Sequence, residues 1–461
     1  MTDHDDIITS VRSGILPAHI YNDADLFAAE RESVFAKNWL FLAHESEVPD
    51  RGDYVVRQQL GDSFIVSRDE SGEIRVMFNM CLHRGMQVCR AEIGNTSHFR
   101  CPYHGWTYKN DGALVGVPFF KEAYGGEDEL RRSDHSLLPA PAMEIVNGLV
   151  FVCLDPDAPP FSSRLGEFRD YLDFYTRPGP DGVEVRGPQR WRLPANWKIG
   201  AENFAGDTYH TPHTHLSVSE IGLMSDAKGG KRKGGTMYFA GGGGGATFPL
   251  APGDLPSRLG VIGYTDEMIK RRAETWPVTI SALIGKDGQI PSAATIFPNL
   301  SFLHLWARVS ESQIVPFTTM RLWQPVSEQE TEVVSWFVVD KAADEEFKRA
   351  SYKAYQMCFG PSGMFEQDDM ENWSSITRVA GGTMARRLQL NNRMGLRTDD
   401  STIAEPLTNF SGPGAAYGGF GEFNQRRWFD LWCRDLESGP IDTKKTTSYP
   451  TSEGDDREHE R

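Results

Sequence analysis

Four side chains in residues 81–104 have the types and spacing of metal ligands. Cys81 and His83 form one pair, Cys101 and His104 form a second, and seventeen residues separate the pairs. Thiolate sulfur and imidazole nitrogen bind zinc and iron–sulfur clusters. We therefore expect the four side chains to hold one metal centre.

Two kinds of centre fit these ligands. Structural zinc accepts Cys₂His₂, but its sites group like ligands, as C-x₂-C followed by H-x₃₋₅-H. Here each segment supplies one cysteine and one histidine, which suits a two-iron cluster with both thiolates on one iron and both imidazoles on the other. The pattern favours a [2Fe–2S] cluster, with zinc as the competing interpretation.

A second set of candidate ligands lies in "ENFAGDTYHTPHTH", residues 202–215. If a helix extends to His210, then Asn203, Asp207 and His210 share one of its faces. His215 follows five residues later, at a spacing that an unbroken helix would splay.

Pro212 offers a way to bring the two histidines together. A proline ends a helix and disfavours helical geometry in the residue before it. We expect the chain to fold back there, so that His215 reaches the metal bound by His210. His213 is the rival ligand if the helix continues through Pro212.

A carboxylate is expected from "FGPSGMFEQDDMENWSSI", residues 359–376. "FGPSG" ends one helix, and in the next Phe365, Asp369, Trp373 and Ile376 form an apolar stripe. An acid on such a face is costly unless it is paired or coordinated.

Asp368 is expected to point away from that stripe, and a solvated helix start would account for Glu366 and Asp368 but not for Asp369. His210, His215 and Asp369 would then form the two-histidine, one-carboxylate triad of non-haem Fe(II) oxygenases, which leaves positions open for O₂.

The first set resembles the Rieske [2Fe–2S] motif, C-x-H-x₁₇-C-x₂-H. Rieske proteins of respiratory complexes carry two further cysteines beside the cluster. Met86 and Tyr103 occupy those positions here, so the resemblance is to the oxygenase branch. The cluster ligands that it implies are Cys81, His83, Cys101 and His104.

The second set resembles the catalytic domain of Rieske ring-hydroxylating oxygenase alpha subunits. The family pattern is Glu-Asn-x₃-Asp-x₂-His-x₄-His, followed far downstream by Asp-Asp, whose second Asp binds iron. The resemblance covers about residues 20–437. The matching positions are Glu202, Asn203, Asp207, His210, His215 and Asp369.

This resemblance implies a terminal oxygenase large subunit, similar to naphthalene and polycyclic-aromatic dioxygenases. Its cofactors would be a [2Fe–2S] Rieske cluster and a mononuclear non-haem Fe(II). It would use O₂ and NAD(P)H-derived electrons for cis-dihydroxylation of an aromatic, preferably polycyclic, hydrocarbon. The implied partners are a ferredoxin, an NAD(P)H reductase and a small beta subunit, in an α₃β₃ assembly built on a homotrimer.

The same resemblance assigns roles in electron transfer and substrate binding. Asp207 would link His210 to His104 of the partner subunit, and Asn203 would lie at the catalytic site. The implied pocket is largely apolar, which favours a hydrocarbon ring, although an aromatic carboxylic acid stays an alternative. For Met364, packing in the hydrophobic core is as good an interpretation as lining the pocket. The pocket residues would be Asn203, Phe204, Phe359, Met364 and Phe365.

The spacing of apolar residues suggests the elements that position these groups. It predicts an α+β protein in which a small all-β domain, the Rieske domain that the resemblance implies, precedes or is inserted within a larger catalytic domain, an antiparallel sheet flanked by helices. The expected segments are a helical one that packs with the catalytic domain (1–37), the Rieske domain (38–157), the catalytic domain (158–440) and a disordered tail (441–461).

Within the catalytic domain, a strand is expected at residues 295–310 and a helix at 196–210. The stretch 229–245 holds nine glycines among seventeen residues and lacks the Gly-Lys-Ser/Thr of a phosphate loop. It is expected to be a mobile surface loop.

The composition limits the class of protein. The formal charge is −16 and no stripe of Lys or Arg appears, so no nucleic-acid partner is expected. The sequence contains no run of eighteen apolar residues, so no membrane-spanning segment is expected. Its acidic start lacks the apolar core of a signal peptide. Six cysteines do not make a disulfide scaffold, which favours a cytoplasmic protein.

Three alternatives remain at this level. A Rieske monooxygenase or demethylase would use the same metal ligands. A zinc-stabilised binding protein would be colourless, whereas an iron–sulfur protein is red-brown. A plain electron carrier would have no use for His210, His215 and Asp369.

Overall fold

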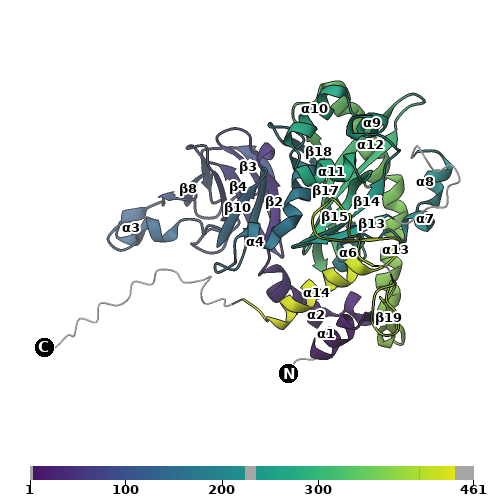
Figure 1. Cartoon of the computed structure of the whole chain (residues 1–461). Helices are drawn as coiled ribbons and strands as arrows, with labels where there is room; N and C mark the ends of the chain where they lie inside the picture. Colours follow the sequence, from purple (N-terminus) through teal and green to yellow (C-terminus); the bar gives the residue numbers. More distant parts are fainter. Residues whose placement is uncertain (1–3, 224–234, 404, 442–461) are drawn as a thin grey trace. The chain divides into compact units, whose positions relative to one another are not determined.

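The chain forms two compact units in a computed structural model that describes residues 4–223, 235–403 and 405–441 (Figure 1). The large unit contains Met1–Phe41 and Pro159–Pro440, and the small unit contains Leu42–Ala158. The sequence predicts boundaries after residues 37 and 157, and the structural junctions fall after Phe41 and Ala158. The expected tail lies, from residue 442, outside the described residues.

An eight-stranded antiparallel sheet organises the large unit and, with its helices, confirms the α+β class. Both edges are formed by strands far apart in the sequence. In order across the sheet the strands are β12 (Val183–Leu193), β18 (Glu330–Asp340), β17 (Ile314–Ser327), β16 (Leu300–Arg308), β15 (Gln289–Ile296), β14 (Gly243–Pro249), β13 (Thr236–Ala240) and β20 (Ala415–Gly418).

Helices cover both faces of this sheet, so its central strands are buried on both sides. On β16, Phe302 stacks on Tyr175 of α5 at 5.0 Å. The other face carries Trp323 of β17, which packs under α6, where an added Cβ at Gly200 would lie 2.6 Å from the indole. Successive residues of a strand point to opposite faces, so Leu303 and Leu305 lie on the α6 side.

The helices of the large unit are mostly short, and none in the described part of the chain combines the length and apolarity needed to cross a bilayer. Their bounds are α1 (His4–Arg12), α2 (Ala24–Glu30), α4 (Phe161–Leu165), α5 (Arg169–Thr176), α6 (Trp197–Phe204), α7 (Thr211–Thr214), α8 (Leu216–Glu220), α9 (Leu255–Val261), α10 (Asp266–Thr275), α11 (Val278–Gly285), α12 (Glu345–Phe359), α13 (Met364–Ala380) and α14 (Phe423–Glu437).

The N-terminal segment packs into the large unit beside α14, as the purple and yellow helices of Figure 1 show. A short strand, β1 (Ile15–Pro17), pairs with β19 (Gln389–Asn391). The carboxylate of Glu30 is fully buried and accepts hydrogen bonds from Lys198 Nζ at 2.6 Å and from two indole N–H groups. A buried charge needs such partners, so this contact ties α2 to α6.

The small unit is all-β apart from short helices such as α3 (Phe120–Tyr124). It contains three small sheets, and Tyr108, Phe99 and Trp106 are buried in its core. The strands are β5 (Ile74–Phe78), β4 (Asp62–Arg68), β3 (Asp53–Gln59) and β6 (Ile93–Asn95) in the first sheet; β7 (His98–Arg100), β8 (Thr107–Lys109) and β9 (Leu114–Gly116) in the second; and β10 (Ala142–Val146), β11 (Leu149–Cys153) and β2 (Leu40–His44) in the third.

The glycine-rich stretch is not a surface loop where the structure describes it. Residues 236–245 contribute β13 and the start of β14, and residues 229–234 lie outside the described residues. Added Cβ atoms would lie 2.6 Å from the Phe168 ring at Gly243 and 2.4 Å from the Tyr238 hydroxyl at Gly245. The glycines are there because neighbouring groups approach the strand backbone closely.

The stretch 295–310, predicted as one strand, forms two. β15 ends at Ile296, and β16 begins at Leu300 and runs back antiparallel to it. Proline lacks the N–H that a central strand must donate. Pro298 therefore lies in the turn between them.

Candidate metal centres and substrate cavity

The two loops that carry the Cys–His pairs have matching backbone hydrogen bonds. Cys81 follows β5 and Cys101 follows β7 directly. In each loop the cysteine N–H donates to the carbonyl five residues ahead at 2.8 Å, and the cysteine carbonyl accepts from the glycine four residues ahead. These glycines, Gly85 and Gly105, have φ of +74° and +75°, which side chains disfavour.

The side chains on these loops suit an iron–sulfur cluster. Cys81 and Cys101 are buried and free, and the rings of His83 and His104 lie 4.4 Å apart. Nδ1 of His83 is buried and has no partner within the described chain, whereas its Nε2 lies 3.3 Å from the hydroxyl of Tyr124. An unpaired buried nitrogen is costly, so the structure leaves Nδ1 of His83 available as a ligand.

The loop that precedes the second set of ligands differs from the prediction. Helix α6 ends at Phe204 and does not extend to His210. Gly206 has φ of +126°, and an added Cβ would lie 2.5 Å from Asn424 Nδ2, so this position requires glycine. The chain leaves the helix at this residue, and Asp207 lies in a loop, where its Oδ1 accepts the backbone N–H groups of Tyr209 and His210.

Pro212 also acts differently from the prediction. It begins a helix instead of ending one, because it lies in the first turn of α7, where proline's missing N–H has no partner to lose. Thr211 is helical in spite of the proline that follows it. The short helix places His210 at its N-cap and His215 at its C-cap, and the two rings lie 5.2 Å apart. His213 is exposed and packs its ring near Tyr209.

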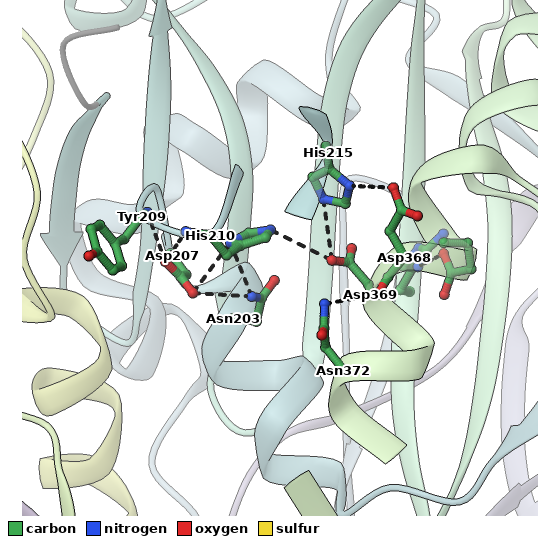
Figure 2. Close-up of polar contacts among 10 residues, drawn as sticks. Asn203, Asp207, Tyr209, His210, His215, Asp368, Asp369 and Asn372 are labelled. Carbon is green, nitrogen blue, oxygen red and sulfur yellow. Dashed lines mark hydrogen bonds and ion pairs between the residues drawn. The ribbon is translucent and has the colours of Figure 1, made fainter. Parts of the chain in front are cut away.

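His210, His215 and Asp369 come together around one point (Figure 2). One ligand atom of each lies within 4.8 Å of the others. Oδ1 of Asp369 lies 3.2 Å from Nε2 of His215 and 3.7 Å from Nε2 of His210. Two neutral imidazoles and one carboxylate suit a divalent iron with open coordination positions.

The helix that supplies Asp369 is buried along a different stripe from the predicted one. Phe365, Asp369 and Trp373 are buried as expected, but Ile376 is 42% exposed. Glu366, predicted to be solvated, is fully buried, and burial raises its pKa to about 7 in spite of the nearby Arg321. The buried side of α13 continues through Thr377 and Ala380 instead of Ile376.

Asp368 was predicted to point away from the site, but it points toward it. Its Oδ2 lies 3.5 Å from Nδ1 of His215, and Figure 2 shows both neighbouring carboxylates reaching the same imidazole. A carboxylate at the second ring nitrogen holds an imidazole in orientation for a metal. Sequence periodicity could not find this contact, because it depends on the position of α7.

Asp207 performs the corresponding role at the other histidine. Its Oδ2 lies 3.3 Å from Nδ1 of His210 and 3.4 Å from the amide of Asn203. Burial alone would raise the pKa of Asp207, but hydrogen bonding and the charge of His210 lower it. Burial likewise opposes charge on His210, yet the hydrogen bond and charge of Asp207 raise the pKa of that ring.

A largely apolar cavity adjoins the three candidate ligands. Asn203, Phe204, Phe359 and Phe365 line it, and Met364 is not among its described lining residues. The sheet supplies the opposite wall of the cavity. The sequence motifs did not predict this wall, because the pattern of residues in a strand does not show whether a face lines a cavity or packs in the core. These further lining residues include Ala246, Phe248, Ala293, Leu303 and Leu305.

Models of two protein families match the chain. Residues 38–131 match the Rieske [2Fe–2S] domain, and residues 180–394 match the catalytic domain of the ring-hydroxylating alpha subunit. The first of these ranges contains the four Cys–His residues. The second contains His210, His215 and Asp369.

Two relatives are similar over nearly their whole length. The N,N-dimethyl phenylurea N-demethylase subunit alpha of Sphingobium sp. (strain YBL2) is 36% identical over 445 residues, which are 92% of each chain. The biphenyl 2,3-dioxygenase subunit alpha of Rhodococcus jostii (strain RHA1) is 35% identical, over 93% of this chain and 90% of that one.

The fold is similar to that of a solved enzyme structure. Naphthalene 1,2-dioxygenase from Rhodococcus sp., bound to indole, superposes with a TM-score of 0.84 and 43% identity, over 94% of this chain and 97% of that chain. The predicted cofactors, a [2Fe–2S] cluster and a mononuclear iron, are confirmed at the level of the domain and of a His–His–Asp candidate site. The chain belongs to the alpha subunits of the Rieske aromatic ring-hydroxylating dioxygenases, which are oxidoreductases.

Proposed function

We propose that this chain is the large subunit of a terminal oxygenase that cis-dihydroxylates an aromatic, polycyclic hydrocarbon with O₂ and NAD(P)H-derived electrons. The observation that carries the proposal is the largely apolar cavity beside His210, His215 and Asp369. No Lys or Arg is among its described lining residues, which argues against an aromatic acid.

Each group of residues has a distinct task in this proposal. Cys81, Cys101, His83 and His104 hold the cluster, and His210, His215 and Asp369 hold the iron. When bound, the cluster supplies single electrons and the iron supplies oxygen chemistry. Phe359 and Phe365 hold the ring beside the iron and exclude water from it.

Asp207 is proposed to connect the two centres across a homotrimer. Its Oδ2 already lies 3.3 Å from Nδ1 of His210. An ionised carboxylate can accept from a second donor at the same time, and we assign that donor to His104 of the partner subunit. A ferredoxin, a reductase and a beta subunit complete the proposed system.

One relative supports a second candidate function. The Sphingobium protein named above is an N-demethylase subunit at 36% identity, so oxidative N-demethylation of an aryl urea is the alternative. The two reactions leave different products, because demethylation releases formaldehyde and dihydroxylation keeps both oxygen atoms on the ring.

Product analysis tests these assignments. The purified protein, with its beta subunit, ferredoxin, reductase and NADH, would be given naphthalene, phenanthrene, biphenyl, a dimethyl phenylurea and benzoate. A cis-dihydrodiol from the polycyclic hydrocarbons supports the proposal. Formaldehyde from the urea without any dihydrodiol would establish the alternative.

Variants separate the two centres. Asp369→Ala should lose turnover and the mononuclear iron while it keeps the visible absorption of the cluster. Glu371→Ala, on the exposed side of the same helix, is the matched control and should keep both. Zinc in place of iron, or a colourless protein after anaerobic preparation, would refute the assignment of both centres.

A further inference from the structure

A fully buried ion pair lies next to the cavity without lining it. Arg321 of β17 and Glu366 of α13 are both 0% exposed, and Nη1 of the arginine lies 2.5 Å from Oε2 of the glutamate. The guanidinium lies 5.4 Å from the ring of Phe204 and 5.0 Å from that of Phe359, which both line the cavity. None of the roles assigned above uses this pair.

Arg321 joins three elements at one point. Its Nη2 donates to the carbonyl of Phe359, the last residue of α12, at 2.6 Å. Its Nη1 meets Glu366 in the first turn of α13. The guanidinium thereby spans the break formed by residues 360–363, and it holds the end of one helix and the start of the next against the sheet.

That junction carries both the wall of the cavity and a ligand. The rings of Phe359 and Phe365 stack 5.0 Å apart at 13°, across the junction. Phe365 also contacts the ring of His215 at 4.9 Å, and Asp369 follows one turn later on α13. A movement of the start of α13 would therefore shift the aromatic wall relative to the metal ligands.

A buried ion pair is a poor device for stability alone. Removing two charges from water costs as much as their attraction returns, and apolar residues of similar size often serve equally well. What a guanidinium adds is a planar fork with donors in fixed directions, which Lys or an apolar side chain does not reproduce. Arg321 uses that directionality at Nη2, which donates to the carbonyl of Phe359, while its Nη1 lies beside the carboxylate of Glu366 as an ion pair without hydrogen-bond geometry.

We propose that Arg321, with Glu366, is a positioning residue that sets the arrangement of Phe359 and Phe365 and thereby the face and edge of the aromatic substrate presented to the iron. The proposal rests on the proposed function, because it takes the cavity as the binding site of the ring. Arg321 acts through the two phenylalanines and does not touch the substrate itself.

Two variants test this role with the charge balance kept. Arg321→Met/Glu366→Met removes both charges and fills the space with apolar atoms. Arg321→Lys keeps the charge and the ion pair but loses the fork. The control is Arg272→Met, which also removes a buried arginine that lies over aromatic rings and pairs with a carboxylate, Asp340. Asp340 keeps Arg271 as a partner, and Arg272 does not line the cavity.

The readouts are the ratio of regioisomeric dihydrodiols from phenanthrene and a crystal structure of each variant. Because misplacement by about 1 Å can change rates up to about a hundredfold, we expect the isomer ratio to change by about fivefold or more in either Arg321 variant. Phe359 and Phe365 should also leave their stacked arrangement. The control should keep the wild-type ratio and ring geometry, with the same iron content.

The proposal requires both changes. An unchanged isomer ratio, or rings that stay stacked as in the wild type, would overturn it, and Arg321→Lys decides the matter if the double variant does not fold. A wild-type protein that forms no dihydrodiol refutes the proposed function instead. The ring geometry in the crystal structures still reports on the positioning role in that case.

Discussion

Asp368 lies 3.5 Å from Nδ1 of His215, on the ring nitrogen opposite to the one that faces Asp369. Two consecutive acids of one helix therefore contact the same imidazole from different sides. We propose that the first orients the ring and that the second shares the metal with it. This arrangement gives the paired aspartates of α13 separate roles.

Replacing Asp368 by alanine should weaken iron binding at the mononuclear site by about tenfold or more, because losing the group that orients a ligating imidazole commonly costs that much. The measurement is competition for Fe(II) with a chelator, with the cluster absorption as an internal standard. Glu371→Ala, exposed on the same helix, should bind as the wild type does. Equal affinities for all three proteins would show that the contact does not support the metal.

Replacing Tyr108 by phenylalanine should lower the reduction potential of the cluster. The Tyr108 hydroxyl lies 3.2 Å from Sγ of Cys81 and donates to it when the sulfur is a thiolate ligand. Such a bond favours the more negative, reduced cluster. A bond worth about 1 kcal/mol corresponds to about 40 mV for one electron. Protein-film voltammetry measures the shift.

The control for that change is Tyr54→Phe in the same core cluster, whose tyrosine interacts with Cys89, a cysteine outside the Cys–His pairs. Its potential should match the wild type. A potential that rises in Tyr108→Phe, or falls equally in both variants, would contradict the assignment of Cys81 as the hydrogen-bonded ligand.

Replacing Asn424 by alanine should loosen the loop that carries Asp207 and His210. The fully buried Asn424 amide lies 2.6 Å from the carbonyl of Ala205 and also contacts the carbonyls of Tyr238 and Gly245. Leaving these buried carbonyls unpaired should cost about 2 kcal/mol or more. We expect weaker Fe(II) binding together with a lower midpoint of thermal unfolding.

Asn38→Ala provides a comparison of matched burial, since Asn38 donates to Val34 and Asp435 away from the site. It should lower the thermal midpoint similarly and leave Fe(II) affinity unchanged. If both variants lose iron to the same degree, the effect is general destabilisation and the specific role of Asn424 is refuted.

Lowering the pH below about 6.5 should reduce the free energy of unfolding of the protein because of His304. Burial and the charge of Arg272 lower the pKa of this ring to about 3. Between these values the unfolded chain takes up a proton that the folded chain does not bind, so at about pH 5.5 the contribution lost is about 1.4 kcal/mol.

His304→Gln should remove that part of the pH dependence, while its amide replaces the contacts with Thr318 and Tyr264. The measurement is the difference in thermal midpoint between about pH 7.5 and pH 5.5 in each protein, so that Glu366, whose pKa of about 7 also lies in this range, contributes equally to both. A difference as large in the variant as in the wild type would mean that other groups carry the effect.

The amino-acid sequence alone determined the kind of chemistry. The two Cys–His pairs, the His210 and His215 spacing, and an acid within an apolar stripe are local patterns, and metal coordination restricts which residue types can form them. The all-β segment followed by mixed segments also predicted the fold class correctly. Even where the helix boundaries were wrong, as at Phe204 and Pro212, the residues brought together did not change.

The tertiary structure decided the partners of those residues. Asp368 contacts His215 across 153 positions of the chain, and Glu366 is buried because Arg321 comes to it from the sheet. The glycines of β14 are buried because Phe168 and Tyr238 approach their backbone. Periodicity within one segment cannot indicate such contacts, because the interacting group lies in another element. The group that stabilises a buried charge, or that leaves room only for glycine, comes from a distant part of the chain.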